Sequence, residues 1–237
     1  MDFLDKYIKI ENDFVYKGLT SELNIFCVLK AHKQFGKNTI VLTNTLYEAN
    51  KVYKELLTHD KNVLLYPMDE LVSFVAEAIS PEFKITRLET LEKIKSGKNN
   101  IIVTNLFGFL KKISNNSNVI NNKISIGDII NRNDLVNILE SYGYSRETLV
   151  TSTGKYAVRG YVVDIFLFRE KHPIRIEFFG DEVESIRYFD QDTQRSKDKT
   201  NNIEIKPVDE IESSDMISLY DYCNNPLVVI YNKQQLL

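Results

Sequence analysis

Short apolar runs alternate with amphipathic stretches in the first part of the chain. Residues 38–43, 62–66 and 100–104 are apolar runs of strand length, and residues 46–57 and 83–97 have helical periodicity. Buried strands that alternate with helices are typical of a parallel sheet covered on both faces. Glycines follow the predicted helices, where left-handed C-terminal caps are expected.

Polar, turn-forming residues at 114–123 indicate a loop at a domain boundary. Beyond it the pattern predicts, in order, a strand at 123–127, a helix at 133–143, antiparallel strands, a polar stretch at 195–202, a helix at 216–223 and a strand at 226–231. The last strand is similar to those of the first block, so we expect an α/β domain interrupted by an inserted α+β domain. The chain stops soon after that strand, as expected for a fragment of a longer protein.

Within the second block, two runs of alternating apolar and polar residues flank Gly180 and Asp181. Alternation with a period of two is typical of half-buried strands, and a Gly-Asp pair between such runs predicts a hairpin. The runs are residues 173–179 and 182–189, and a further strand is predicted at 156–168.

Successive side chains of a strand point to opposite faces of the sheet, so Arg175, Glu177 and Phe179 are predicted to share the outer face. Arg159, next to Gly160, lies on the preceding strand. One interpretation of this face is an ordinary exposed surface with a local pair between Arg175 and Glu177. The other is a protein-binding patch, where arginine and aromatic residues are enriched. The pattern alone favours neither interpretation.

Composition excludes several classes of protein. The 237 residues include 43% apolar and 27% charged residues, which is ordinary for a globular protein. A formal net charge of −3, with basic and acidic residues mixed along the chain, disfavours nonspecific DNA binding as the main task. No run is apolar enough for a membrane span or a signal peptide, so a cytoplasmic location is expected. Cys27 and Cys223 lie too far apart in sequence to indicate a zinc site.

No nucleotide-binding loop is predicted. Both Gly-Lys dipeptides follow a helix and precede a strand, the reverse of the order that a phosphate loop needs. A subtler candidate lies at the start of the first long helix, but Leu23, Asn24 and Ile25 replace the Gly, Lys and Ser or Thr of an intact loop. Thr20 or Ser21 is better explained as the N-cap of that helix.

No catalytic or metal-binding arrangement is predicted either. His32, His59 and His172 are scattered, without the spacing of a metal site or a catalytic triad. We therefore expect no cofactor, no metal and no catalysis in this chain.

Several motifs carry a family resemblance. YAVRGYVVDIF, IRIEFFGDEVESIRYFD and DTQRS resemble the module shared by UvrB and the bacterial transcription-repair coupling factors, and LLYPMDEL and SPEFKITRLETL extend the likeness over nearly the whole chain. Relative to UvrB, the phosphate loop at residues 18–25 is eroded, and residues 66–87 carry no tyrosine-rich hairpin. The chain therefore resembles the N-terminal UvrB-homology region of the coupling factors.

That resemblance implies a degenerate helicase-like (RecA-like) parallel-sheet domain at residues 1–120 and 206–237. It implies an inserted UvrA-binding α+β domain with an antiparallel sheet at residues 121–205. The arginine of the VRG motif is Arg159, and no part of this fragment is expected to be an enzyme, although the full-length family members are ATP-dependent DNA translocases.

The other family contact positions fall on Arg175, Glu177 and Phe179, the face obtained from strand parity. The implied function is a non-catalytic module that recruits UvrA to stalled RNA polymerase in nucleotide-excision repair. RNA polymerase, double-stranded DNA and a masking C-terminal domain are further partners implied for the full-length protein. The alternatives are a fragment of a UvrB-like ATP-dependent helicase or damage-loading factor, and a domain that binds DNA directly.

Overall fold

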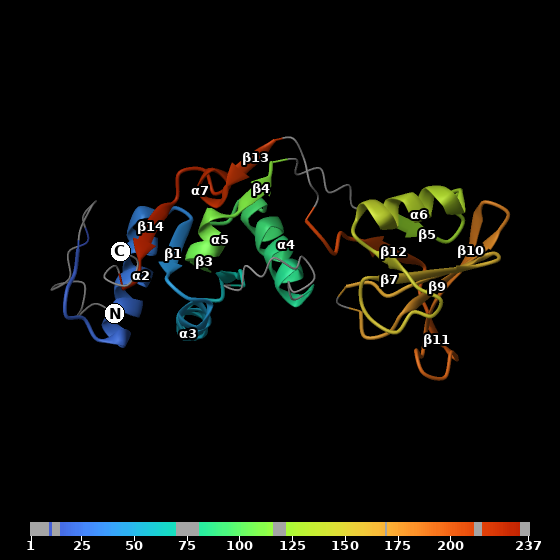
Figure 1. The fold of residues 1–237 in the computed structure, drawn as a ribbon, viewed down its shortest axis with the longest axis horizontal. Coiled ribbons are helices and arrows are strands. Elements are labelled where there is room, and N and C mark those ends of the chain that lie inside the picture. Colours follow the sequence, from blue (N-terminus) through green and yellow to red (C-terminus); the bar gives the residue numbers. More distant parts are fainter. Residues whose placement is uncertain are drawn as a thin grey trace. The chain divides into compact units, whose positions relative to one another are not determined.

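The computed structural model describes residues 10, 15–69, 81–115, 122–168, 170–210 and 215–232. The chain divides into two compact units (Figure 1): unit 1 is Met1–Asn115 with Met216–Leu237, and unit 2 is Asn116–Asp215. Unit 1 holds a parallel sheet and unit 2 an antiparallel one, so the predicted mixed α/β class is confirmed. The assignment of these units as a helicase-like domain and an inserted UvrA-binding domain stays a prediction.

Unit 1 is built on a four-stranded sheet of order β14-β1-β3-β2, with every neighbouring pair parallel. Its elements are α2 (Ser21–Phe35), β1 (Thr39–Thr43), α3 (Leu46–Leu57), β2 (Val63–Tyr66), α4 (Pro81–Lys95), β3 (Ile101–Asn105), α5 (Leu106–Leu110), β4 (Lys112–Ser114), β13 (Met216–Ser218), α7 (Leu219–Tyr222) and β14 (Leu227–Ile230). The predicted strands of the first block are confirmed. The late strand β14 joins them beside β1, with Thr39 opposite Leu227.

Helices cover both faces of this sheet, which explains why its strands are apolar at successive positions. Val41 and Val103 belong to the cluster that packs against α2 and α3. Ile40 and Ile102 belong to the cluster that contains residues of α4 and α7. Neighbouring side chains of a strand point to opposite faces, so burial of both faces requires an unbroken apolar run.

The ends of α2 follow the chemistry predicted for them. The side chain of Thr20 accepts a hydrogen bond from the backbone N–H of Leu23, so the predicted N-cap is confirmed. Gly36 ends the helix in the left-handed region, at φ 58°. Glu22 lies in the first turn, where backbone N–H groups lower the pKa of its carboxyl.

Unit 2 contains a six-stranded sheet of order β11-β10-β9-β8-β7-β6, antiparallel except for the pair β6–β7. Its elements are β5 (Asn122–Ser125), α6 (Arg132–Ser141), β6 (Ser145–Arg146), β7 (Lys155–Arg159), β8 (Val162–Ile165), β9 (Ile174–Phe179), β10 (Glu182–Phe189), β11 (Ser196–Lys199) and β12 (Asn202–Ile205). The predicted hairpin is confirmed as β9–β10, with Gly180 at φ 64° in its turn.

Helix α6 covers one face of the six-stranded sheet (Figure 1), and the core of unit 2 lies between them. Leu135 and Leu139 of α6 are fully buried, as are Ile174 and Ile176 of β9. Because side chains alternate along β9, the polar residues between these isoleucines lie on the opposite face. That opposite face is called the outer face below.

Two sequence predictions are wrong, and one strand was not predicted. The single strand expected at 156–168 is the hairpin β7–β8, because Gly160 adopts φ 56° and the chain turns back there. The polar stretch 195–202 contains edge strand β11, whose four residues are all exposed and so leave no apolar pattern. The helix expected at 216–223 begins only at Leu219, because residues 216–218 pair with β4 as strand β13.

Candidate protein-binding site

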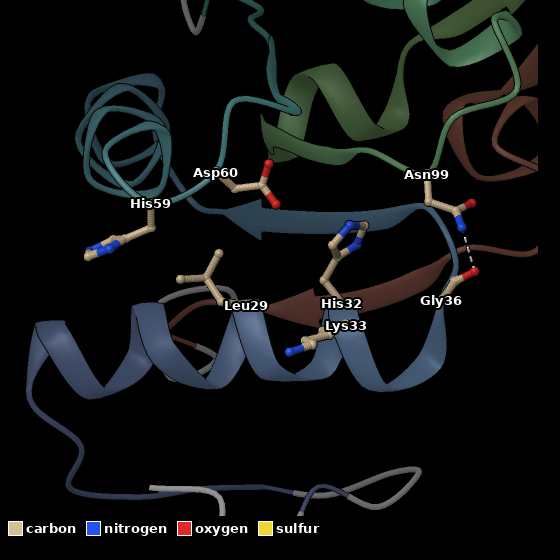
Figure 2. Close-up of a pocket in the computed structure, with 7 residues that line it drawn as sticks. All are labelled: Leu29, His32, Lys33, Gly36, His59, Asp60 and Asn99. Carbon is tan, nitrogen blue, oxygen red and sulfur yellow. Dashed lines mark hydrogen bonds between the residues drawn. The ribbon is translucent and has the colours of Figure 1, made fainter. Parts of the chain in front are cut away.

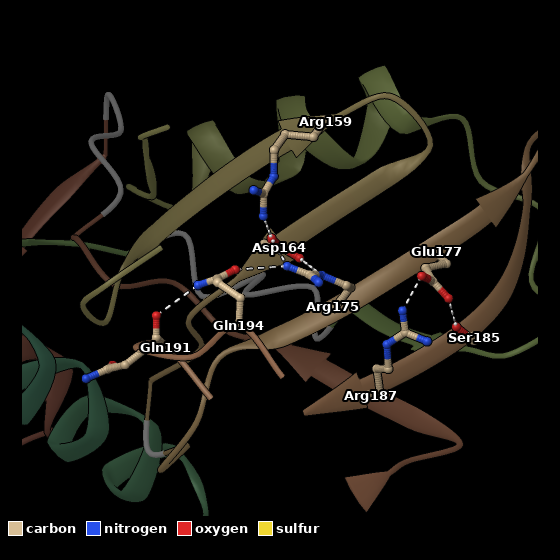
Figure 3. A network of polar contacts seen from close by, with 8 residues as sticks. All are labelled: Arg159, Asp164, Arg175, Glu177, Ser185, Arg187, Gln191 and Gln194. Atoms are coloured by element: carbon tan, nitrogen blue, oxygen red, sulfur yellow. Dashed lines mark hydrogen bonds and ion pairs between the residues drawn. The ribbon is translucent and has the colours of Figure 1, made fainter. Parts of the chain in front are cut away.

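The outer face of unit 2 carries the site residues predicted from the sequence. In β9 the burial alternates, with Arg175 and Glu177 partly exposed and Phe179 exposed. Arg159 lies at the end of β7, two strands away. Figure 3 shows the charged members of this group on β7 and β9, on either side of β8 in one sheet. The geometry thus brings the four residues onto one face, while their role in binding stays a prediction.

A buried carboxylate joins the two arginines of this face. Asp164 of β8 lies directly opposite Arg175 of β9, and only 1% of its side chain is exposed. Arg175 donates from Nε to Asp164 Oδ1 at 2.7 Å and from Nη2 to Oδ2 at 2.9 Å. Arg159 donates to the same Oδ2 through its Nη2. A bidentate pair of this kind is a strong, charge-assisted contact.

Further contacts hold Arg175 in place. Its Nη2 also donates to Oε1 of Gln194 at 3.1 Å, and its guanidinium carbon lies 4.6 Å from the centroid of the buried Phe189 ring. The hydrogen bonds to Asp164 are the main reason that the pKa of Arg175 is raised above its usual value. Arg175 is therefore a well-packed side chain, with 16% of it exposed.

A tight turn presents Gln194. Asp190 Oδ1 accepts hydrogen bonds from the backbone N–H groups of Asp192 and Thr193. The hydrogen bond from the Thr193 N–H, together with the Lys197 ammonium, lowers the pKa of the Asp190 carboxyl. Gln194 adopts φ 58°, and its Nε2 donates to the carbonyl of Gln191 at 2.8 Å (Figure 3). The DTQRS motif thus contributes directly to the charged group on the outer face.

Glu177 does not pair with its strand neighbour Arg175, the local pair that the first interpretation of this face assumed. Its two carboxylate oxygens accept from Arg187 and from the hydroxyl of Ser185, the latter at 2.7 Å (Figure 3). Both partners lie on β10, next to β9. Each charged residue of β9 is therefore neutralised across strands, to one side by β8 and to the other by β10.

Phe179 is different from its charged neighbours, because 77% of it is exposed. It ends β9 and lies opposite Glu182, which in turn forms an isolated bridge with Ile129. Ile129 is itself 75% exposed. Aromatic and arginine side chains are enriched where a protein surface meets a partner.

Sequence reasoning missed Asp164, Arg187 and Gln194. Asp164 could have been found, since it alternates with the apolar residues of β8 as Arg175 does in β9. That Asp164 contacts both arginines depends on strand register, which no local pattern contains.

Unit 1 has a cleft of about 300 Å³ at the C-terminal end of α2 (Figure 2). It brings together His32 and His59, which the sequence places far apart, with Lys33, Asp60 and Asn99 around them. His32 Nδ1 lies 2.9 Å from the hydroxyl of Thr39, and burial lowers the pKa of the imidazole. Within the described parts of the chain, no three His, Cys, Asp or Glu side chains are grouped as metal ligands.

Comparison with known proteins connects unit 2 to a family. Residues 123–211 match the family described as the UvrB interaction domain. Unit 2 is therefore similar to that domain over most of its length. The matched residues include every strand of the six-stranded sheet, and with them Arg159, Asp164 and Phe179.

This match lies within a longer similarity. The chain is 30% identical over 233 residues to the transcription-repair-coupling factor of Bacillus subtilis (strain 168), across 89% of this chain and 20% of that protein. It is 31% identical over 224 residues to the transcription-repair-coupling factor of Staphylococcus aureus (strain MRSA252), across 92% of this chain and 18% of that protein. The chain is thus a homologue of a segment of these proteins, about a fifth of their length. No helix in the described ranges is long and apolar enough to cross a membrane.

Proposed function

We propose that this chain is a non-catalytic docking module in transcription-repair coupling, and that unit 2 binds UvrA through its outer face. The proposal rests on one observation: the family match and the predicted site residues fall on the same sheet. The residues matched to the UvrB interaction domain contain the sheet whose outer face holds Arg159, Arg175, Glu177 and Phe179. Homologues named transcription-repair-coupling factors supply the biological setting.

The outer face suits a protein partner with an acidic group beside an apolar pocket. Arg159 keeps 46% of its side chain exposed, so its guanidinium can meet a carboxylate or a carbonyl of the partner. Phe179 offers an exposed ring for such a pocket. Aromatic and arginine side chains contribute most of the binding energy in many interfaces.

The rest of the proposal concerns the longer protein in which such a chain works. There, in the bacterial cytoplasm, UvrA is recruited to stalled RNA polymerase on double-stranded DNA during nucleotide-excision repair. A C-terminal domain of that protein masks the outer face of unit 2 until the polymerase is engaged. ATP-dependent translocation belongs to the remainder of that protein.

Isothermal titration calorimetry of the chain with purified UvrA tests the proposal. We expect saturable binding, and Arg159→Ala should weaken it by about 2 kcal/mol or more, the loss typical of a hot spot. Arg146→Ala is the matched control, because Arg146 is an exposed arginine of the same sheet on strand β6. Absence of binding by the folded wild-type chain, or equal losses in both variants, would contradict the proposal.

ATP titration separates this function from that of a UvrB-like helicase fragment. The side chain of Thr20 is occupied in capping α2, and Leu23, Asn24 and Ile25 offer neither the lysine charge nor the metal-binding hydroxyl of a phosphate loop. We expect no saturable binding of ATP with Mg²⁺ to this chain. Binding of ATP that Thr20→Ala weakens would favour the helicase fragment instead.

A further inference from the structure

The buried carboxylate of Asp164 lies between two arginines on the outer face of unit 2. Asp164 is almost completely buried. Its two carboxylate oxygens accept two hydrogen bonds from Arg175 and one from Arg159. The group of three side chains has a formal charge of one positive unit. A carboxylate is costly to bury unless charged and hydrogen-bonded partners surround it, so Asp164 and the two arginines must be considered as a unit.

The two arginines are not equivalent in this group. Arg175 uses Nε and Nη2 on Asp164 and Gln194, stacks on Phe189, and keeps 16% of its side chain exposed. Arg159 contacts Asp164 through Nη2 alone and keeps 46% exposed. Of the two, Arg159 is therefore the one with donors available to a partner, while Arg175 is part of the support.

We propose that Asp164 is a positioning residue of the outer face, which holds the Arg159 guanidinium in the orientation that meets the partner. This inference rests on the proposed binding of UvrA. An exposed arginine samples many rotamers and loses that freedom on binding. Anchoring one nitrogen of Arg159 to a buried, immobile carboxylate restricts it beforehand, so less affinity is lost to ordering. Arg175 and Gln194 act through Asp164, by fixing the carboxylate itself.

The sign of one substitution separates positioning from net charge. Asp164→Asn keeps the size of the side chain and one acceptor oxygen, and it raises the formal charge of the group by one positive unit. If attraction of positive charge to an acidic partner governed the affinity, the variant would bind UvrA more tightly. If Asp164 positions Arg159, the variant binds about tenfold more weakly, because the guanidinium loses its charged anchor.

A purely structural role for Asp164 would also weaken binding, and a double-mutant cycle distinguishes it. When Asp164 acts through Arg159, Asp164→Asn should cost affinity in the wild-type background and almost none in the Arg159→Ala background. When Asp164 merely supports the sheet, the same loss should occur in both backgrounds. The cycle therefore measures how strongly the two substitutions depend on each other in their effect on UvrA affinity. General destabilisation does not produce such a dependence.

The experiment measures UvrA affinity by calorimetry for the whole chain, its two single variants and the double variant, with thermal unfolding of each followed by circular dichroism. We expect a loss of about tenfold for Asp164→Asn that disappears without Arg159. Unchanged or tighter binding of Asp164→Asn, or additive losses, would overturn the positioning role.

Gln194→Ala keeps the proposal testable should Asp164→Asn fail to fold, because Gln194 lies in a surface turn and braces the group through Arg175. We expect it to weaken binding about threefold, again only when Arg159 is present. An unaltered affinity would count against positioning. If Arg159→Ala lowers the affinity and neither support variant does, positioning fails and UvrA docking stands; if the wild-type chain does not bind UvrA, both fail.

Discussion

Replacement of Phe179 by alanine should separate binding from folding. Burying a phenylalanine side chain contributes about 1.5–3 kcal/mol. Phe179 is 77% exposed in the chain by itself, so most of that contribution is still available to a partner. We expect Phe179→Ala to lose about 1–2 kcal/mol of binding to UvrA, which is roughly five- to thirtyfold in Kd.

The same exposure predicts little effect on the fold. Surface substitutions away from special features change the free energy of unfolding by about 0.5 kcal/mol or less. The assay is calorimetric titration with UvrA, together with guanidinium denaturation of the variant followed by circular dichroism. A large shift in the unfolding midpoint would mean that Phe179 supports the sheet and is not a free anchor.

Tyr47→Ala is the matched control. Tyr47 is 80% exposed, like Phe179, but it lies on α3 of unit 1, outside the residues matched to the UvrB interaction domain. We expect its loss to leave UvrA affinity unchanged. Wild-type affinity in Phe179→Ala, or equal losses in the two variants, would refute the argument from exposed apolar area.

Three further predictions concern stability and reactivity. Burial and a 2.6 Å hydrogen bond to Glu140 raise the pKa of Tyr156 to about 12. The contribution of this hydroxyl to stability is therefore present at neutral pH, and it is lost as the pH rises from about 10, the pKa in the unfolded chain, through 12. Tyr156→Phe should therefore lower the free energy of unfolding, measured by urea denaturation, by about 1 kcal/mol at pH 7 and by less at pH 11. An equal difference between the wild-type chain and the variant at both pH values would contradict this. Gly108→Ala should lower the stability by about 1–3 kcal/mol, because the new Cβ would lie 2.4 Å from Thr104 Oγ1, and a raised melting temperature in calorimetry would show that the contact relaxes. Burial raises the pKa of the Cys223 thiol to about 12, so we expect iodoacetamide to label Cys223 only after unfolding, and labelling of the native chain in mass spectrometry would be the contrary result.

Much of the architecture could be predicted from local pattern. Strands β1 and β3 of unit 1 are buried on both faces, so each required an unbroken apolar run that stands out in the sequence. Strand β9 is buried on one face, so its alternation predicted which side chains point outward. The boundaries failed where tertiary contacts compete with propensity, as in β13, where pairing with β4 replaced the start of the expected helix.

The candidate site divides in the same way. By itself, the sequence determined that Arg175, Glu177 and Phe179 share a face, because strand parity is a property of neighbouring residues. Only the tertiary structure decided that Asp164 lies opposite Arg175, and that Glu177 pairs with β10 and not with its own strand. The physical reason is that periodicity is local, whereas register between strands depends on turns, bulges and the packing of the whole unit.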